Sequence, residues 1–384
     1  MRLLLVIGAL MVLPVFGHFR GKNMGTLVHS SFEMLEKHHI AKRKATPFIL
    51  GGKKWTYDEI PQHFIPIMIQ IDKEHFCGGT LLDGKHILTA AHCFFRSNTI
   101  CNRLFRYLAQ NLNLHIKLIV SQSRWRQGTY DPNQMVIHAD GNCIGCKASS
   151  DGKMRPAKAH KNIVDSVIIP KSYVSSKCRR SDIAVVRLTE PVATGFDMRI
   201  SYQEKPAAGT ILSAGGFGYN PNVTTANVFV SQPSFPADEK DESARFLNVI
   251  NATVAECARG NRKDVICIEE KESNACRGDS GGGILDDSGK SGHMTVYGVV
   301  AHGTSCKLMH SVLMEKRGFN PLPTFNFYML ISAGLRTDAN FKGGYFTSTD
   351  FYAPFICKAT FQGAKLDGPN KCSDLDQNQE VLSF

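Results

Sequence analysis

Beyond its first 17 residues, the 384-residue chain has no apolar run of the about 18 residues that a membrane-spanning helix needs. We therefore expect no membrane span and no membrane partner. Long helical periodicity is scarce, and the chain contains no internal repeat. Short β-branched runs punctuated by glycine and proline favour an all-β sandwich or barrel over an α/β fold. The clearest of these runs cover residues 65–71, 86–89, 164–169, 183–188 and 296–300.

The start of the chain is typical of a secretory signal over residues 1–17. It combines an early positive charge, an apolar run too short to cross a bilayer, and small residues before the expected cut. A short membrane anchor is the alternative. The polar and basic segment 18–48, which contains Lys42-Arg43-Lys44, is interpreted as a propeptide. These features predict a secreted, extracellular protein.

The 12 cysteines, an even number, favour disulfides in an oxidising compartment. The pair Cys143-x-x-Cys146 offers two zinc ligands, but no second pair stands at finger spacing. Disulfides are therefore favoured, and we expect no metal and no cofactor. In the same compartment, the sequons that begin at Asn222 and Asn251 are acceptors for N-glycosylation.

Acidic residues are sparse in one part of the chain. Residues 94–181 contain 15 Lys or Arg against 4 Asp and no Glu, a net +11 that equals the formal charge of the whole chain. Such a concentration binds polyanions such as sulfated glycans, or steers acidic substrates. A solvated surface loop is the plainer alternative. Nucleic acid is not expected as the partner of a secreted protein.

Three short strings carry chemistry: Leu88-Thr89-Ala90-Ala91-His92-Cys93, Asp182-Ile183-Ala184 and Gly278-Asp279-Ser280-Gly281-Gly282. They offer, in turn, a general base, a carboxylate that orients the base, and a nucleophile. The same triad occurs in other orders on other folds. With these strings the chain resembles the trypsin/chymotrypsin family of serine endopeptidases, and its overall style is similar to that of divergent, secreted invertebrate members such as those of nematodes.

The resemblance covers most of residues 49–360 and implies two antiparallel six-stranded β-barrels with the active site in the cleft between them. It also implies a last strand that leads into a short C-terminal helix, which Pro354 is expected to limit to its first turn. Two stretches do not fit the family and are interpreted as insertions, a basic one within 94–162 and another at about 307–343. The polar tail 361–384 is expected to be loose apart from Cys372.

The resemblance gives each triad residue a role. Ser280 is the nucleophile, and His92 takes its proton and returns it to the leaving amine. Asp182 holds the imidazole in the right tautomer. The backbone N–H groups of Gly278 and Ser280 are expected to bind the tetrahedral oxyanion. His92 and Asp182 would come from the first barrel, and Ser280 from the second.

The string Ile49-Leu50-Gly51-Gly52 resembles the mature N-terminus of the family. Ile49 lies 43 residues before His92, about where the family places it. A cut before Ile49 frees an ammonium that is expected to pair with Asp279, because a buried charge needs a partner. An ordinary Gly-Gly turn is the alternative interpretation.

The resemblance also implies pairings for six cysteines: Cys77 with Cys93, Cys257 with Cys267, and Cys276 with Cys306. Six more remain, which allow 15 pairings, and the sequence does not choose among them. They are Cys101, Cys143, Cys146, Cys178, Cys357 and Cys372.

The pocket positions of the family fall on Asn274, Gly303 and Gly344. Asn274 is neutral, and the two glycines leave the pocket open, which favours a large uncharged side chain in the substrate. The residue before the expected cut is Phe48, so the enzyme would be able to process itself. Cleavage near Lys42-Arg43-Lys44 followed by trimming is the competing route.

Two departures from the family stand near the site. Ala301 replaces a serine that binds the triad carboxylate, and His302 replaces a tryptophan on the strand that lines the substrate. Neither removes a reacting group. We therefore predict a zymogen of a serine endopeptidase that acts on protein substrates and is open to proteinaceous inhibitors. The alternatives are a silent homologue that binds partners through its basic insertion, and an esterase of another fold.

Overall fold

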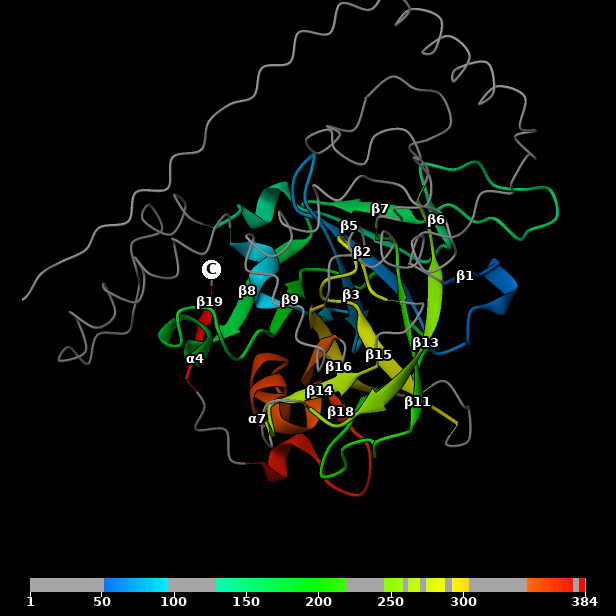
Figure 1. Cartoon of the computed structure of the whole chain (residues 1–384). Helices are drawn as coiled ribbons and strands as arrows, with labels where there is room; N and C mark the ends of the chain where they lie inside the picture. Colours follow the sequence, from blue (N-terminus) through cyan, green and yellow to red (C-terminus); the bar gives the residue numbers. More distant parts are fainter. Residues whose placement is uncertain are drawn as a thin grey trace, which may run out of the picture. The chain divides into compact units, whose positions relative to one another are not determined.

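Figure 1 shows the computed structural model, which describes residues 52–95, 129–218, 245–257, 262–269, 274–286, 292–303, 344–375 and 380–383. The chain divides into two units, residues 1–45 and 46–384, and every described residue belongs to the second. The expected signal, the propeptide and the 307–343 insertion lie outside the described residues.

The first sheet has eight strands in the order β19-β8-β9-β4-β3-β2-β5-β7, and every pair in it is antiparallel. The core of this half is made mainly by apolar side chains on its central strands. The strand bounds are β2 (Pro66–Gln70), β3 (Phe76–Leu81), β4 (His86–Thr89), β5 (Val136–Ala139), β7 (Lys158–Lys161), β8 (Val164–Pro170), β9 (Ala184–Leu188) and β19 (Val381–Ser383).

The second sheet contains a closed ring of six antiparallel strands, because β15 pairs with both β11 and β16. Three short strands attach to this ring, and one of them, β10, runs parallel to its neighbours β16 and β18. The ring strands are β11 (Ile211–Gly216), β13 (Asn248–Ala255), β14 (Val265–Ile268), β15 (Gly283–Asp286), β16 (Met294–His302) and β17 (Tyr345–Ser348). The attached strands are β1 (Lys53–Lys54), β10 (Met198–Ile200) and β18 (Lys365–Leu366).

The expected all-β double-barrel class is confirmed, but the strand count differs in the first half. The second barrel closes with six strands, whereas the first sheet has eight, and its end strands β7 and β19 do not pair with each other among the described residues. Strand β7 lies in the segment expected to be a basic insertion, and β19 lies in the C-terminal tail. These two end strands bring the sheet to eight strands.

The runs predicted from β-branched residues all form strands. They correspond to β2, β4, β8, β9 and β16, with ends that agree to within about two residues. Strand β8 shows why the prediction works, because six of its seven residues are buried and only Asp165 is exposed. A strand buried on both faces appears in the sequence as a nearly continuous apolar run.

Helices are few in the described residues. The two α-helices are α4 (Lys171–Ser175) and α7 (Thr349–Ala359), and 3₁₀ turns cover Tyr57–Glu59, Ala91–Phe94, Pro132–Gln134 and Cys372–Asp374. A separate two-stranded pair joins β6 (Cys143–Ile144) to β12 (Arg245–Phe246). In the described part of the chain, no helix is long and apolar enough to cross a membrane.

The expectation for Pro354 was wrong. Helix α7 continues through Pro354 and ends at Ala359, five residues later. Tertiary packing accounts for this, because Tyr352, Phe355 and Ile356 are all buried on the helix. Burial of large side chains, at about 1.5–3 kcal/mol each, offsets the one helix hydrogen bond that a proline cannot donate.

The C-terminal tail is also more ordered than expected. In its described parts, β18 pairs with β10 and β19 pairs with β8, so the tail contacts both sheets. Leu366 and Leu382, which are among the few apolar residues of the tail, are buried. A disulfide between Cys357 and Cys372 ties the tail to α7. The polar composition of the tail does not indicate these strand pairings or this disulfide.

Candidate active site

The two sheets meet at a short contact between backbone segments. The Gly78 N–H on β3 donates to the Ser280 carbonyl at 2.7 Å, across 202 positions of the chain. Gly281 has φ +87°, and a Cβ there would lie 2.1 Å from Thr89 Oγ1. Only glycine fits this position, because a side chain would clash and the backbone is left-handed. The Gly-Asp-Ser-Gly string therefore sits against β3 and β4.

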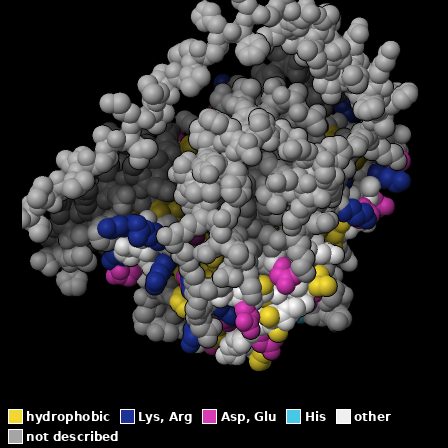
Figure 2. All heavy atoms as spheres, viewed as in Figure 1, with side chains coloured by type: hydrophobic (Ala, Val, Ile, Leu, Met, Phe, Trp, Pro, Cys, Tyr) yellow, Lys and Arg dark blue, Asp and Glu magenta, His cyan; other side chains and the backbone are white. Residues whose placement is uncertain are grey.

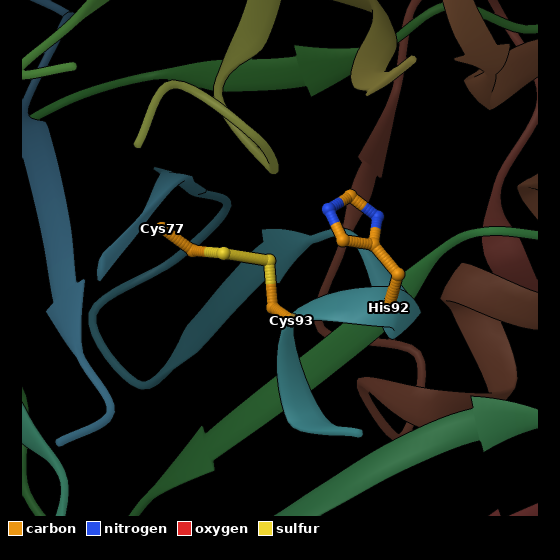
Figure 3. Close-up of side chains that lie close together, drawn as sticks. All are labelled: Cys77, His92 and Cys93. Carbon is orange, nitrogen blue, oxygen red and sulfur yellow. A yellow bond between two sulfur atoms is a disulfide. The ribbon is translucent and has the colours of Figure 1, made fainter. Parts of the chain in front are cut away.

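The imidazole of His92 is positioned by a 3₁₀ turn and a disulfide. The turn Ala91–Phe94 follows directly after β4, and Cys93 within it is bonded to Cys77 of β3. Figure 3 shows the ring of His92 beside this bridge. The ligand atoms of Cys77, His92 and Cys93 lie within 4.8 Å of one another, but both sulfurs are used by the disulfide. The cluster therefore braces the base rather than offering a metal site.

Asp182 holds His92 through two hydrogen bonds. One carboxylate oxygen accepts from the His92 backbone N–H at 2.8 Å, and the other lies 2.7 Å from His92 Nδ1. Asp182 stands just before β9, which pairs with β4, so the sheet brings the two residues together. Its own carbonyl accepts from Thr347 Oγ1 at 2.9 Å. The hydrogen bond from the His92 amide to Asp182 does not involve position 301, where this chain has Ala301 in place of the expected serine.

The charge of Asp182 controls the basicity of His92. Burial lowers the pKa of the imidazole, but attraction to the Asp182 carboxylate and the hydrogen bond between them outweigh it. The net pKa of His92 therefore lies above its ordinary value of 6.5. An imidazole with a raised pKa is a stronger base toward a hydroxyl group.

Ser280 lies on the turn that precedes β15, and it is partly exposed. Gly278 in this turn has φ +99°, which glycine adopts without strain. The Ser280 carbonyl lies 3.9 Å from the sulfur of Cys93, the neighbour of His92. No hydrogen bond joins Ser280 Oγ to His92 Nε2 within the described residues. Such bonds are often long in unliganded sites and shorten when substrate binds.

Asp279 is fully buried beside the nucleophile. Its carboxylate accepts from Gly218 N–H and Cys276 N–H, each at 2.7 Å. Burial raises the pKa of this carboxyl to about 7, while the two N–H donors and the charge of Arg245 act in the opposite direction. Ile49, the expected ammonium donor, lies outside the described residues.

Arg245 is a residue near the site that the sequence analysis missed. It donates to the Phe217 carbonyl at 3.2 Å, and the N–H of the same peptide group, on Gly218, donates to Asp279. Its guanidinium lies 4.1 Å from the centre of the Phe76 ring, next to Cys77. One peptide group therefore links a cation to the buried carboxylate. Arg245 is the first described residue after residues 219–244, and no sequence pattern marks it.

The expected pocket residues fall at one end of the second barrel. In the β16–β17 pair, His302 stands opposite Tyr345, so Gly303 and Gly344 are neighbours across the strands. The side chain of Asn274 is 1% exposed. Its carbonyl lies 3.6 Å from the sulfur of Cys276. The residue expected at the pocket floor is therefore neutral and buried, and the two residues expected at its walls are glycines.

The family model for trypsin matches residues 55–148 and 147–314, which is more than half of the chain. The chain belongs to the trypsin family. It is 23% identical to mouse mannan-binding lectin serine protease 1 over 69% of this chain and 33% of that protein. It is 27% identical to phenoloxidase-activating enzyme 1 of Spodoptera litura over 60% of this chain and 52% of that protein. These matches thus span about a third and half of those two relatives.

Two other relatives are matched over a larger share of their own length. Trypsin iota of Drosophila melanogaster is 23% identical over 68% of this chain and 81% of that protein. Trypsin-like protease try-5 of Caenorhabditis elegans is 23% identical over 64% of this chain and 76% of that protein. All these identities are low, so the chain is a divergent family member.

Disulfides in this trypsin-family chain use every described cysteine, ten in all. Cys77–Cys93 and Cys257–Cys267 are present, and Cys276 is bonded, although Cys306 lies outside the described residues. The pairings that the sequence left open include Cys143–Cys146 and Cys357–Cys372. The sulfurs of Cys143 and Cys146 are therefore not free to bind zinc.

The remaining site residues divide between described and undescribed segments. Asn251 is exposed on β13, where a glycan would reach solvent, and Asn222 lies outside the described residues. His302 is exposed at the end of β16, and Ala301 before it is partly buried.

Replacing Arg245 with glutamine is expected to destabilise the intact chain. Losing a charged donor and a cation–π contact costs about 2 kcal/mol, which corresponds to a melting temperature lower by roughly 5 °C. Since Arg245 stabilises the charged form of Asp279, the loss should be larger above pH 7 than at pH 5, where that carboxyl is neutral. Thermal unfolding of the variant in a Ser280→Ala background measures both effects.

The matched control for Arg245→Gln is Arg245→Lys, which keeps the positive charge but loses the planar guanidinium group and its several N–H donors. It should lose less stability at pH 8 than the glutamine variant. An equal loss for Arg245→Gln at pH 5 and pH 8 would contradict an electrostatic role toward Asp279.

Proposed function

We propose that this chain is a secreted zymogen that becomes a serine endopeptidase. The observation that carries the proposal is the pair of hydrogen bonds between His92 and Asp182, with Ser280 held against the same turn by β3. The ten bonded cysteines support an oxidising compartment. We assign residues 1–17 to the signal, 18–48 to the propeptide and 49–360 to the protease domain.

The reaction divides peptide hydrolysis into two easier steps. Ser280 Oγ attacks the substrate carbonyl carbon while His92 Nε2 takes the hydroxyl proton. The negative charge that develops on the carbonyl oxygen is met by the N–H groups of Gly278 and Ser280. His92 then gives the proton to the leaving amine, and an acyl-enzyme remains. Water activated by His92 hydrolyses this ester and restores Ser280.

Asp182 supports this cycle without taking the proton itself. Its contact with Nδ1 keeps Nε2 free to accept from Ser280, and its charge stabilises the imidazolium that forms. Its second oxygen is occupied by the His92 amide, which fixes the turn as well as the ring. The base is therefore oriented through both its backbone and its side chain.

The pocket supports a preference for bulky uncharged residues before the cut bond. Asn274 carries no charge to pair with Lys or Arg, and Gly303 with Gly344 leaves room for a large group. Aromatic side chains, leucine and methionine fit these properties. A library of peptides, with cut sites read by mass spectrometry, tests the proposal. Cuts after aromatic residues are expected, and cuts confined to Lys or Arg would contradict the pocket assignment.

Self-processing is expected from the same preference, because Phe48 precedes the proposed cut. Phe48→Arg should abolish maturation of the purified chain at Ile49, while Phe48→Tyr should mature normally. The accumulation of the mature form, followed on gels with N-terminal sequencing, measures this. Unchanged maturation of Phe48→Arg would show that another route, such as cleavage near Lys42-Arg43-Lys44, prepares the enzyme.

The partners of such an enzyme are protein substrates and proteinaceous inhibitors. We also propose that the chain has a polyanion such as a sulfated glycan as a ligand, supported by the net +11 of residues 94–181. In the described part of the insertion, Arg155 and Lys158 share one carboxylate, Asp140, at 2.6 and 3.2 Å. This pairing leaves less free charge there than the composition suggests.

A further inference from the structure

A cavity of about 890 Å³ lies outside the triad, where segments from both sheets meet. Helix α4 and the turn before Asp182 contribute from the first sheet. The residues before β14 and the start of α7 contribute from the second. The cavity contains neither His92, Asp182 nor Ser280, so peptide hydrolysis gives it no role.

Positive charge predominates on the wall of this cavity. Four cationic side chains line it, against the two carboxylates of Asp264 and Glu380. The cationic residues are Lys171, Arg180, Arg262 and Lys263. A concave surface lined by one sign of charge concentrates its field and attracts counter-ions.

The two carboxylates are already engaged by two of the cations. Asp264 binds Arg262 through both oxygens, at 2.7 and 3.0 Å, and Glu380 pairs with Lys171 at 2.5 Å. Among the described residues, no carboxylate lies within ion-pair distance of Arg180 or Lys263. Arg180 belongs to the half of the molecule with the first sheet, and Lys263 belongs to the half with the second. An anion that binds both cations would therefore contact both halves.

Hydroxyl groups and an aromatic ring complete the cavity. Ser172 Oγ donates to Ser181 Oγ at 2.7 Å, and the Tyr352 hydroxyl also donates to Ser181 at 2.9 Å. Phe351 is 44% exposed and packs edge-on against Tyr352 at 4.9 Å between ring centres. The free face of Phe351 offers apolar surface to a sugar ring beside the charged groups.

We propose that this cavity binds a sulfated oligosaccharide. A volume of this size holds a ligand of several rings, and pockets for drug-sized ligands measure about 300–1,000 Å³. Sulfate groups match Arg180 and Lys263, which form no ion pair among the described residues, and a sugar ring matches Phe351. Binding of single-stranded nucleic acid uses several aromatic platforms, whereas Phe351 is the one large exposed aromatic residue among those lining the cavity. The inference does not depend on the proposed protease activity.

This site differs from the basic insertion, which provides the internal control. Lys158 and Lys161 are exposed on β7 of the insertion, and they do not line the cavity. On the face that Figure 2 shows, Lys and Arg side chains occur in several places near acidic ones, so charge alone does not select a site. Two double variants with the same change of charge therefore separate the cavity from the insertion.

The test measures binding of a heparin-derived hexasaccharide to the full chain carrying Ser280→Ala, by calorimetry at several salt concentrations. Arg180→Glu with Lys263→Glu should weaken binding at least about tenfold and reduce the slope of log Kd against log salt. Lys158→Glu with Lys161→Glu should change Kd less than about threefold. Phe351→Ala should weaken hexasaccharide binding but leave the salt slope unchanged, since it carries no charge.

Several outcomes would overturn the proposal. They are an equal or larger loss in the Lys158/Lys161 variant, equal binding of the desulfated hexasaccharide, and no wild-type binding below about 1 mM. Tighter binding of an oligonucleotide or phosphopeptide with the same charge would assign the cavity to another ligand class. Unfolding temperature checks each variant, and Arg180→Gln replaces the double variant should that one fail to fold. Its expected result is a weaker loss in the same direction.

Discussion

Replacing Ser280 with alanine is expected to lower kcat on a peptide substrate by about a millionfold. The reason is that no acyl-enzyme can form without Oγ, and His92 then has no hydroxyl to deprotonate. Substrate binding and the proposed oxyanion contacts of the Gly278 and residue 280 N–H groups remain, so a residual acceleration of about 10³–10⁴ over water is expected. Steady-state kinetics of the mature protein on a fluorogenic peptide with Phe before the cut bond measures the loss.

The control for Ser280→Ala is Ser373→Ala. Ser373 is exposed in the 3₁₀ turn of the C-terminal tail, and its hydroxyl contacts only Asp374 among the described residues. Its replacement should leave kcat and KM unchanged. A Ser280→Ala protein that keeps more than about one per cent of wild-type kcat would contradict the assignment of the nucleophile.

Asp182→Asn is the second large effect, and we expect it to lower kcat by about 10⁴-fold. The amide keeps the shape of the carboxylate, but it no longer stabilises the imidazolium, and it favours the wrong tautomer of His92. In the wild type, the Asp182 carboxylate forms two hydrogen bonds with His92, at 2.7 and 2.8 Å. The change therefore acts on the chemical step and should leave KM much less affected.

The pH profile distinguishes this electrostatic role from a loss of folding. Neutral His92 is the active base, so activity should rise with pH through a pKa that lies above 6.5 in the wild type. Asp182→Asn removes the charge and the carboxylate bond that raise this pKa, and the acid limb should move to lower pH. An unshifted limb in the variant would contradict the account.

A matched control for the Asp182 variant exists on the same sheet. Asp165 lies on β8 and forms an ion pair with Arg187, away from His92. Asp165→Asn should change kcat less than about twofold, because exposed ion pairs contribute about 0–1 kcal/mol to stability and this one does not contact the site. A large kinetic effect there would mean that removal of any charge from this sheet disturbs the site.

The strands are the part of the fold that the sequence predicts well. Strands such as β8 and β9 are buried, so their apolar runs are continuous and easily seen. His92 and Asp182 stand at the ends of two strands that pair with each other, and their distance follows from the sheet. Local composition is informative there because burial and function act on contiguous residues.

The parts that the sequence does not predict depend on contacts between distant segments. Arg245 reaches Asp279 through the Phe217–Gly218 peptide, and this path has no local signature. Pro354 is tolerated because the faces of α7 are packed, which the proline alone does not indicate. The cavity near Arg180 and Lys263 joins segments that lie more than 80 positions apart.

The most direct test of the account is made on purified secreted protein. N-terminal sequencing and labelling with a phosphonofluoridate active-site probe are done on the same sample, with Ser280→Ala as the unlabelled control. The account predicts a new terminus at Ile49 and a single label on Ser280. A chain with Ile49 at its terminus that takes no label would contradict the account, because cleavage would then have produced a protein without a working nucleophile.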